Sequence, residues 1–143
     1  YFDFHEFLQN HRKGMTPSTP NIPLIYALES KLEDIYSEGL SARYQRHERL
    51  NSLVHLWVEA NGFNLFPDRA YASKTLTCVR NTLGIDVLEF IRLLRENFNC
   101  IIDGGYGKLK GRTFRISNMG DESDKTINDL LHQLSETLRT LRS

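Results

Sequence analysis

The sequence lacks the features that mark several large classes of protein. No apolar run approaches the roughly 20 residues of a membrane-spanning helix, and no segment resembles a signal peptide. The net charge is zero, from 18 basic and 18 acidic residues, so the basic excess of a nucleic-acid-binding module is missing. We therefore expect neither a membrane nor a nucleic acid as a partner.

Cysteine is scarce as well, since Cys78 and Cys100 are the only two in the chain. Both stand among apolar, strand-like neighbours, and they form neither a disulfide framework nor a metal-binding motif. This pattern favours buried thiols in a reducing compartment. We therefore expect a cytoplasmic protein without a metal site.

The motifs of a self-contained active site are missing too. The segment Gly105–Lys108 is too short for a Walker loop, and Lys108 is not followed by serine or threonine. The glycines from Gly104 to Gly111 do not match the dinucleotide-binding fingerprint. None of the five histidines has an obvious cysteine or serine nucleophile as a partner. The sequence therefore indicates no complete catalytic centre.

What the sequence does have is the composition of an ordinary globular protein. Its 143 residues are 40% apolar and 25% charged, which suits one domain with a real core or slightly more. The chain begins at Tyr1 and not at a methionine, so we expect it to be a piece of a longer polypeptide.

The periodicity of apolar residues predicts an α+β fold. Residues at helical spacing indicate four helices, over about 23–38, about 41–60, from the Asp86 cap to about 97, and from Asp121 or Ser123 onward. Shorter apolar or alternating runs indicate four strands, over 63–66, 73–80, 100–102 and 113–116. This order predicts a small, mainly antiparallel sheet covered on one face by helices.

The stretch from Cys100 to Asp121 is the most informative part of the chain. After a glycine-rich, basic loop, Thr113-Phe114-Arg115-Ile116 alternates at the period of a strand. We expect Phe114 and Ile116 to face the helices and Arg115 to lie on the uncovered face. The planar guanidinium of Arg115 suits a carboxylate or a phosphate. An arginine of an edge strand in solvent, or one in a structural ion pair, is the alternative interpretation.

A second anion-friendly segment precedes the first predicted helix. Three prolines between Gly14 and Pro23 indicate an extended, stiff backbone, and Thr16, Ser18 and Thr19 present three hydroxyls. Hydroxyls beside a helix N-terminus make a plausible anion site. Simple capping of the helix, for which Asn21 is well placed, is the alternative.

Together these two segments resemble the class V aminotransferases, in particular the alanine–glyoxylate and serine–glyoxylate group. The resemblance rests on matches that follow in the same order along nearly the whole chain. They are Gly-Met-Thr-Pro-Ser-Thr-Pro-Asn from Gly14, Glu-Gly-Leu from Glu38, Ala-Arg-Tyr-Gln-Arg-His from Ala42, Ser-Lys-Thr-Leu-Thr-Cys-Val from Ser73, Gly-Ile-Asp from Gly84, and Gly104 to Asp121.

The resemblance implies the C-terminal part of a pyridoxal-phosphate enzyme of fold type I. Residues 1–20 would be a lead-in from a large domain, and residues 21–143 the C-terminal small domain. Arg115 would bind the α-carboxylate of the substrate. Thr19 and Thr16 would reach the cofactor phosphate of the neighbouring subunit in a homodimer. The lysine that carries pyridoxal phosphate would lie before Tyr1, so none of the six lysines present is assigned to catalysis.

The reaction implied is transfer of an amino group from alanine or serine to a 2-oxo acid such as glyoxylate or pyruvate, and the chain alone is expected to be inactive. An aspartate or phosphoserine aminotransferase, a cysteine desulfurase-like enzyme of the same class, and a stand-alone amino-acid-binding regulatory module are the alternatives. The desulfurase would need a catalytic cysteine on a mobile loop, and the apolar settings of Cys78 and Cys100 do not suit that role.

Overall fold

The computed structural model describes residues 3–142 and divides the chain into two units, Tyr1–Leu40 and Ser41–Ser143. The first unit holds α1 (Phe4–His11) and α2 (Ile22–Glu38). The helix predicted over 23–38 is confirmed as α2, with the side chain of Asn21 accepting a hydrogen bond from the backbone N–H of Leu24. It ends at Gly39, whose φ of +85° favours glycine.

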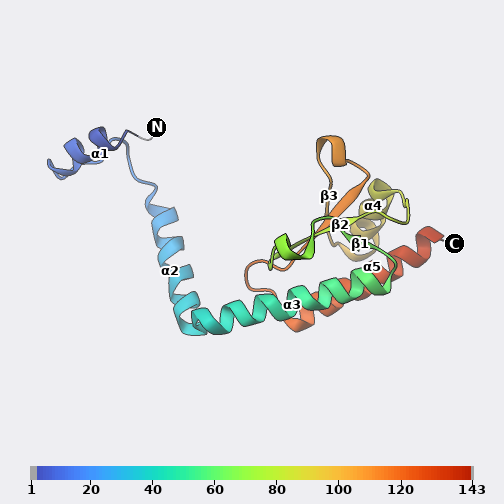
Figure 1. Ribbon diagram of the computed structural model, residues 1–143. Helices are drawn as coiled ribbons and strands as arrows, with labels where there is room; N and C mark the ends of the chain where they lie inside the picture. Colours follow the sequence, from blue (N-terminus) through green and yellow to red (C-terminus); the bar gives the residue numbers. More distant parts are fainter. Residues whose placement is uncertain (1–2, 143) are drawn as a thin grey trace. The chain divides into compact units, whose positions relative to one another are not determined.

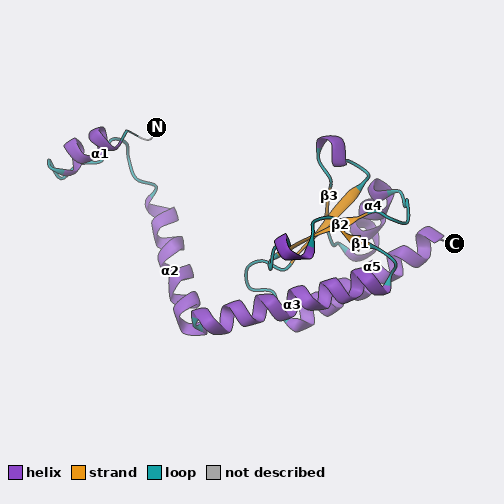
Figure 2. Ribbon diagram, in the orientation of Figure 1, coloured by secondary structure: helices purple, strands orange, loops and turns teal. Residues whose placement is uncertain are grey.

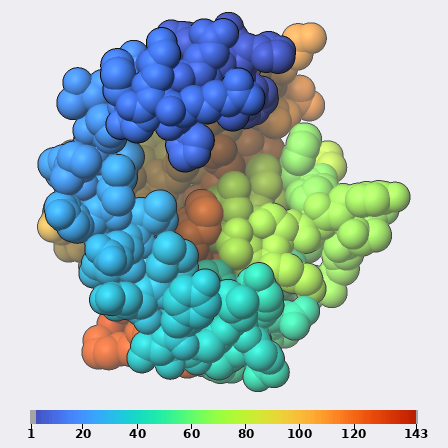
Figure 3. Space-filling model, turned by 90° about the vertical axis from the view of Figure 1, so that its left-hand side faces the viewer, coloured from blue at the N-terminus to red at the C-terminus, as the bar shows by residue number. Residues whose placement is uncertain are grey.

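The apolar stripe of α2 is exposed. Its leucines and isoleucine at positions 24, 25, 28 and 32 all lie at the surface, and no residue of the helix is buried. Figure 3 shows α1 in dark blue and α2 in lighter blue with their side chains standing at the surface. The helical spacing therefore predicts the helix correctly, but the helix adds nothing to the core formed by the described residues.

The second unit contains the sheet and three long helices (Figures 1 and 2). Its elements in chain order are α3 (Leu40–Ala60), β1 (Asn64–Leu65), β2 (Leu76–Arg80), α4 (Val87–Phe98), β3 (Asp103–Gly104), β4 (Thr113–Ser117) and α5 (Asp124–Arg142). The strand order is β1-β2-β4-β3, and every neighbouring pair is antiparallel. This confirms the predicted α+β fold.

One predicted strand is wrong in position, and one alternative interpretation of Arg115 is excluded. The strand predicted over 100–102 is wrong in position, because Ile102 is buried but backbone pairing begins at Asp103. An apolar run reports burial, which does not require a ladder of hydrogen bonds. The strand β4 pairs on both sides, with β2 and with β3, so Arg115 does not belong to an edge strand.

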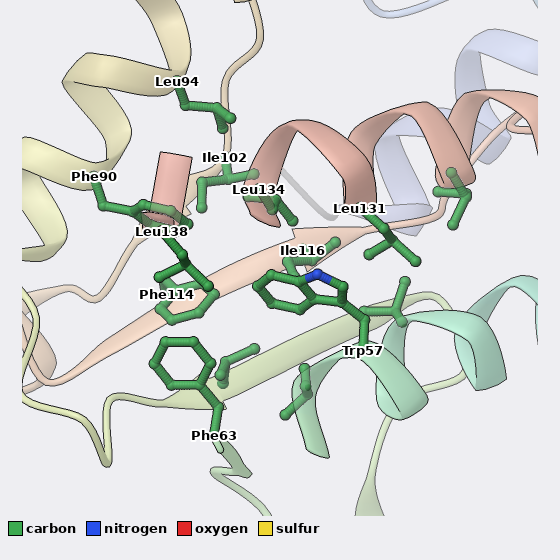
Figure 4. Packing of buried hydrophobic residues seen from close by; sticks show 14 of the residues in the cluster. Trp57, Phe63, Phe90, Leu94, Ile102, Phe114, Ile116, Leu131, Leu134 and Leu138 are labelled. Atoms are coloured by element: carbon green, nitrogen blue, oxygen red, sulfur yellow. The ribbon is translucent and has the colours of Figure 1, made fainter. Parts of the chain in front are cut away.

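The core lies between the sheet and the helices, on the face of Phe114 and Ile116, as predicted. Both residues are fully buried. The ring of Phe114 meets those of Phe63 and Phe90 edge-on, with centroids 5.2 and 5.6 Å apart. Figure 4 shows Trp57 of α3 pointing into the same cluster, which α4 and α5 complete. The helices of this unit cover this face of the sheet, and Arg115 lies on the opposite face.

The basic run at the start of α3 holds the chain that follows β4. The side chain of Arg46 donates to the carbonyl oxygens of Gly120 and Glu122, at 3.2 and 2.7 Å. Arg49 forms a two-point ion pair with Asp124, at 2.9 and 2.6 Å. These arginines thereby fix the loop between β4 and α5, whose residues line the candidate site described below.

Candidate functional site

The open face of the sheet brings three polar side chains into one row. In the strand register Arg115 of β4 lies opposite Cys78 of β2 on one side and opposite Asp103 of β3 on the other. Directly opposite residues of antiparallel strands have their Cβ atoms within about 5.5 Å on the same face. The row therefore places a cation beside a carboxylate and a thiol on the face that the helices leave uncovered.

Two neighbouring side chains contact the guanidinium of Arg115, but not every N–H donor of that group has an acceptor. Its Nη2 donates to Oδ2 of Asp103, and its guanidinium carbon lies 4.6 Å from the centroid of the Tyr106 ring. Its Nε is buried and has no hydrogen-bond partner among the described residues. The side chain is 27% exposed, so it is reachable from solvent. The interpretation of Arg115 as part of an ion pair is thus confirmed, while one donor of its fork is left without an acceptor.

Tyr106 reaches this position from the glycine loop. Its hydroxyl donates to the same Oδ2 of Asp103, at 2.8 Å. The loop turns back so closely that a Cβ atom on Gly105 would lie 2.1 Å from the carbonyl oxygen of Leu109. Only glycine fits there. Gly105 therefore serves to set the loop geometry that places the Tyr106 ring against the guanidinium.

The charges of the pair stabilise one another. The hydrogen bond from Tyr106 and the neighbouring guanidinium of Arg115 hold the pKa of Asp103 below its usual value. Burial alone would lower the pKa of Arg115, but the hydrogen bond and the charge of Asp103 outweigh it and raise that pKa. Both groups are therefore charged at neutral pH.

A groove runs beside the pair, with a cavity volume of about 690 Å³. Apolar side chains such as Leu76, Ile101 and Met119 form part of its wall, and among the described residues Arg115 is the only lysine or arginine that lines it. Its carboxylates are Asp103, Glu122 and Asp129. The groove can therefore hold a small ligand with one anionic group, which Arg115 would bind.

Neither cysteine has the setting of a reactive thiol. Cys78 and Cys100 are free and half-buried, less buried than the sequence context predicts. Burial raises the pKa of both thiols above the ordinary value for cysteine. Since the thiolate is the reactive form, this disfavours a nucleophilic role for either residue.

The second candidate segment lies in the first unit. The hydroxyl of Thr16 donates to the carbonyl oxygen of Ser18 at 2.7 Å, which stabilises the turn. Thr19 is exposed, and its hydroxyl has no hydrogen-bond partner among residues 3–142. The capping of α2 falls to Asn21, so capping does not account for the two threonines. The structure thus places Thr16 and Thr19 in one segment, and Arg115 in the other unit.

Other kinds of site are not found in the described part of the chain. No group of three or more histidine, cysteine or acidic side chains there could hold a metal ion. Among the same residues, no helix combines the length and the apolarity needed to cross a membrane.

Asp103 and Tyr106 are the site residues that sequence reasoning missed. Each belongs to the stretch that frames Arg115, but their roles depend on the register of β3 with β4 and on the turn after Gly105. An acidic residue directly before a glycine pair, near an isolated strand arginine, was the available signal. By itself that signal does not fix the register.

Comparison with known proteins identifies aminotransferases as relatives. The chain is 36% identical over 115 residues to an uncharacterized aminotransferase of Methanocaldococcus jannaschii, a match that covers 80% of this chain and 30% of that protein. It is 33% identical over 126 residues to the serine–glyoxylate aminotransferase of Arabidopsis thaliana, covering 87% and 31% of the two chains. No family model matches the sequence.

Solved structures agree with the sequence relatives. The ureidoglycine–glyoxylate aminotransferase of Bacillus subtilis superposes with a TM-score of 0.85 and 27% identity, covering all of this chain and 38% of that one. The chain therefore spans about a third of the length of the proteins it matches.

Proposed function

Because the chain belongs to the class V aminotransferases, we propose that it is the C-terminal part of a pyridoxal-phosphate-dependent aminotransferase and binds the α-carboxylate of the substrate. The full protein would move an amino group between alanine or serine and a 2-oxo acid such as glyoxylate or pyruvate. Relatives named for glyoxylate as a substrate support this choice.

One observation supports the assignment of Arg115 as the residue that binds the substrate carboxylate. Nε and Nη2 lie on the same edge of the guanidinium plane, and a carboxylate with two oxygen atoms on that edge can accept from both. Asp103 accepts a hydrogen bond only from Nη2, through one of its oxygen atoms, and Nε has no acceptor among the described residues. A buried donor without a partner is costly. A substrate carboxylate would satisfy both donors, which the ion pair with Asp103 does not.

The residues of this chain suit contacts with the cofactor phosphate, but none of them suits the covalent attachment of the cofactor. All six lysines are exposed, and none lines the groove, so the lysine that carries pyridoxal phosphate is expected elsewhere in the full protein. The cofactor would supply the electron sink, and the protein would orient the substrate. Thr19 would donate a hydrogen bond to the phosphate group, and Thr16 would do so when its hydroxyl turns away from the carbonyl oxygen of Ser18. The exposed, unpaired hydroxyl of Thr19 fits that task.

The quaternary arrangement is part of the proposal. We infer a homodimer in which Thr16 and Thr19 reach the phosphate bound by the other subunit, as the family resemblance implies. We also infer a reducing compartment such as the cytoplasm, which the free thiols of Cys78 and Cys100 support.

A direct assay tests the function. We expect the full-length protein, loaded with pyridoxal phosphate, to convert glyoxylate to glycine when alanine or serine is the donor, and pyruvate to alanine when serine is the donor. We expect the 143-residue chain alone to give no turnover, because the groups that hold and use the cofactor lie outside it. Amino-acid product is quantified by chromatography, with aspartate and phosphoserine as comparison donors.

Two results would contradict the proposal. Turnover by the isolated chain would show that it contains a complete active site. Failure of the loaded full-length protein to transfer an amino group from any of the four donors would remove the assignment as an aminotransferase of this group.

A further inference from the structure

The charge distribution of the groove suggests how the site selects its substrate. Arg115 is the only cation that lines it within residues 3–142, and Asp103 is already in contact with that cation. Glu122 and Asp129 add two more carboxylates to the wall. A ligand with one carboxylate can therefore find a partner here, whereas a ligand with two would place the second near like charges.

Asp103 is positioned to yield to a ligand. Its side chain is 49% exposed, and an ion pair with so exposed a partner contributes little to stability because solvent screens it. Its contact with Arg115 is made through one oxygen, which also accepts from Tyr106. A carboxylate that accepts from Nε and Nη2 together would make the stronger interaction. Asp103 can thus pair with Arg115 in the empty site, and a substrate carboxylate can still displace it.

Tyr106 keeps the guanidinium in place during such an exchange. Its ring contact with Arg115 does not depend on the oxygen of Asp103, and the loop geometry that Gly105 permits holds the ring. When the ion pair opens, the displaced carboxylate remains tied to the Tyr106 hydroxyl. The negative charge of Asp103 therefore stays close to the bound ligand.

We propose that Asp103 is a specificity-determining residue of the carboxylate site: it pairs with Arg115 in the empty site, gives way to one substrate carboxylate, and disfavours substrates with a second negative charge. This rests on the proposed function of Arg115. Asp103 thereby favours amino acids with small uncharged side chains, such as alanine and serine, over aspartate and phosphoserine. The discrimination arises from repulsion of the wrong substrate as well as attraction of the right one.

The test uses the loaded full-length enzyme and two acceptors that differ by one carboxylate, pyruvate and oxaloacetate. For Asp103→Asn we expect the KM for pyruvate to fall about twofold to fivefold, because a neutral amide competes less for Arg115. We expect the ratio of kcat/KM for oxaloacetate to that for pyruvate to rise roughly tenfold, because a nearby like charge is removed.

A second variant and a control sharpen the result. Tyr106→Phe keeps the ring but removes the hydroxyl that tethers Asp103, so the KM for pyruvate should fall in the same direction by a smaller factor. Glu59→Gln breaks another exposed arginine–carboxylate pair of the same unit, with Arg69, and neither residue lines the groove. It should leave the selectivity ratio unchanged.

The outcomes separate the two proposals. A higher KM for both acceptors in Asp103→Asn would mean that Asp103 only positions Arg115. An unchanged ratio of kcat/KM for oxaloacetate to that for pyruvate would mean that the charge of Asp103 does not discriminate between the acceptors. Either result overturns this inference. An equal change of the ratio in Glu59→Gln would overturn it as well, since the effect would then come from overall charge. If Arg115→Lys leaves every KM unchanged, the proposed function itself fails.

Discussion

Replacing Arg115 with lysine in the full-length enzyme should raise the KM for the amino acid and for the 2-oxo acid alike, by roughly tenfold to a hundredfold. One ammonium group cannot reproduce the two parallel hydrogen bonds of the guanidinium, and a lost hydrogen bond to a charged partner costs about 1.5–3 kcal/mol. Lysine would also lose the contact that the guanidinium makes with the ring of Tyr106. Both substrates carry the α-carboxylate, so both constants should change together.

Arg80→Lys is the matched control. Arg80 lies on the same open face of the sheet, its guanidinium carbon is 5.1 Å from the centroid of the Phe66 ring, and it donates to the carbonyl oxygen of Phe66 at 3.2 Å. It does not line the groove of Arg115. Steady-state kinetics should therefore show KM values within about twofold of wild type, as for an ordinary surface substitution. An equal effect of the two substitutions would mean that the open face responds as a whole and that Arg115 has no special role.

Replacing Leu94 with alanine should destabilise the second unit by about 2–5 kcal/mol. Leu94 lies on α4, is fully buried, and points toward the region of Ile102 (Figure 4). Its removal leaves a cavity between α4 and the chain that leads into β3. Amide hydrogen exchange of β2 and β4 in the full-length protein reports this loss without requiring the whole protein to unfold in one step.

Leu88→Ala provides the comparison on the same helix. Leu88 is 58% exposed, so the same chemical change there removes little buried area and should cost less than about 0.5 kcal/mol. The change in helix propensity is the same for both substitutions. Equal protection of the β4 amides in the two variants would contradict the packing described for α4.

The sequence predicts best where a local rule decides the structure. Alternation at period two places Phe114 and Ile116 on the core face and Arg115 on the other, and the structure confirms both. The cap at Asp86 is also confirmed, since its side chain accepts from the backbone of Leu88 and Glu89. These features depend on a few neighbouring residues, and tertiary contacts reinforce them.

Prediction fails where the partner of a residue is distant in the chain. Arg49 of α3 is paired with Asp124, 75 positions away, and helical spacing around Arg49 does not predict that contact. The pair of Arg115 with Asp103 likewise depends on strand register. The spacing of residues within a single helix or strand predicts neither contact.

A local signal was also overlooked. Helix α1 is absent from the sequence prediction, although Asp3 followed by Glu6 has the spacing of a helix N-terminus. The side chain of Asp3 does accept hydrogen bonds from the backbone of His5 and Glu6. The same segment holds four aromatic residues between Tyr1 and Phe7, of which Tyr1 and Phe2 lie outside the described residues.

The most direct measurement is a crystal structure of the full-length enzyme, loaded with its cofactor, in complex with a non-reacting analogue of alanine that keeps the α-carboxylate. We expect the carboxylate to accept hydrogen bonds from Nε and Nη2 of Arg115, with Asp103 turned away and still bonded to the hydroxyl of Tyr106. An analogue bound elsewhere, with the ion pair of Arg115 and Asp103 intact, would contradict the role of Arg115 as the carboxylate-binding residue.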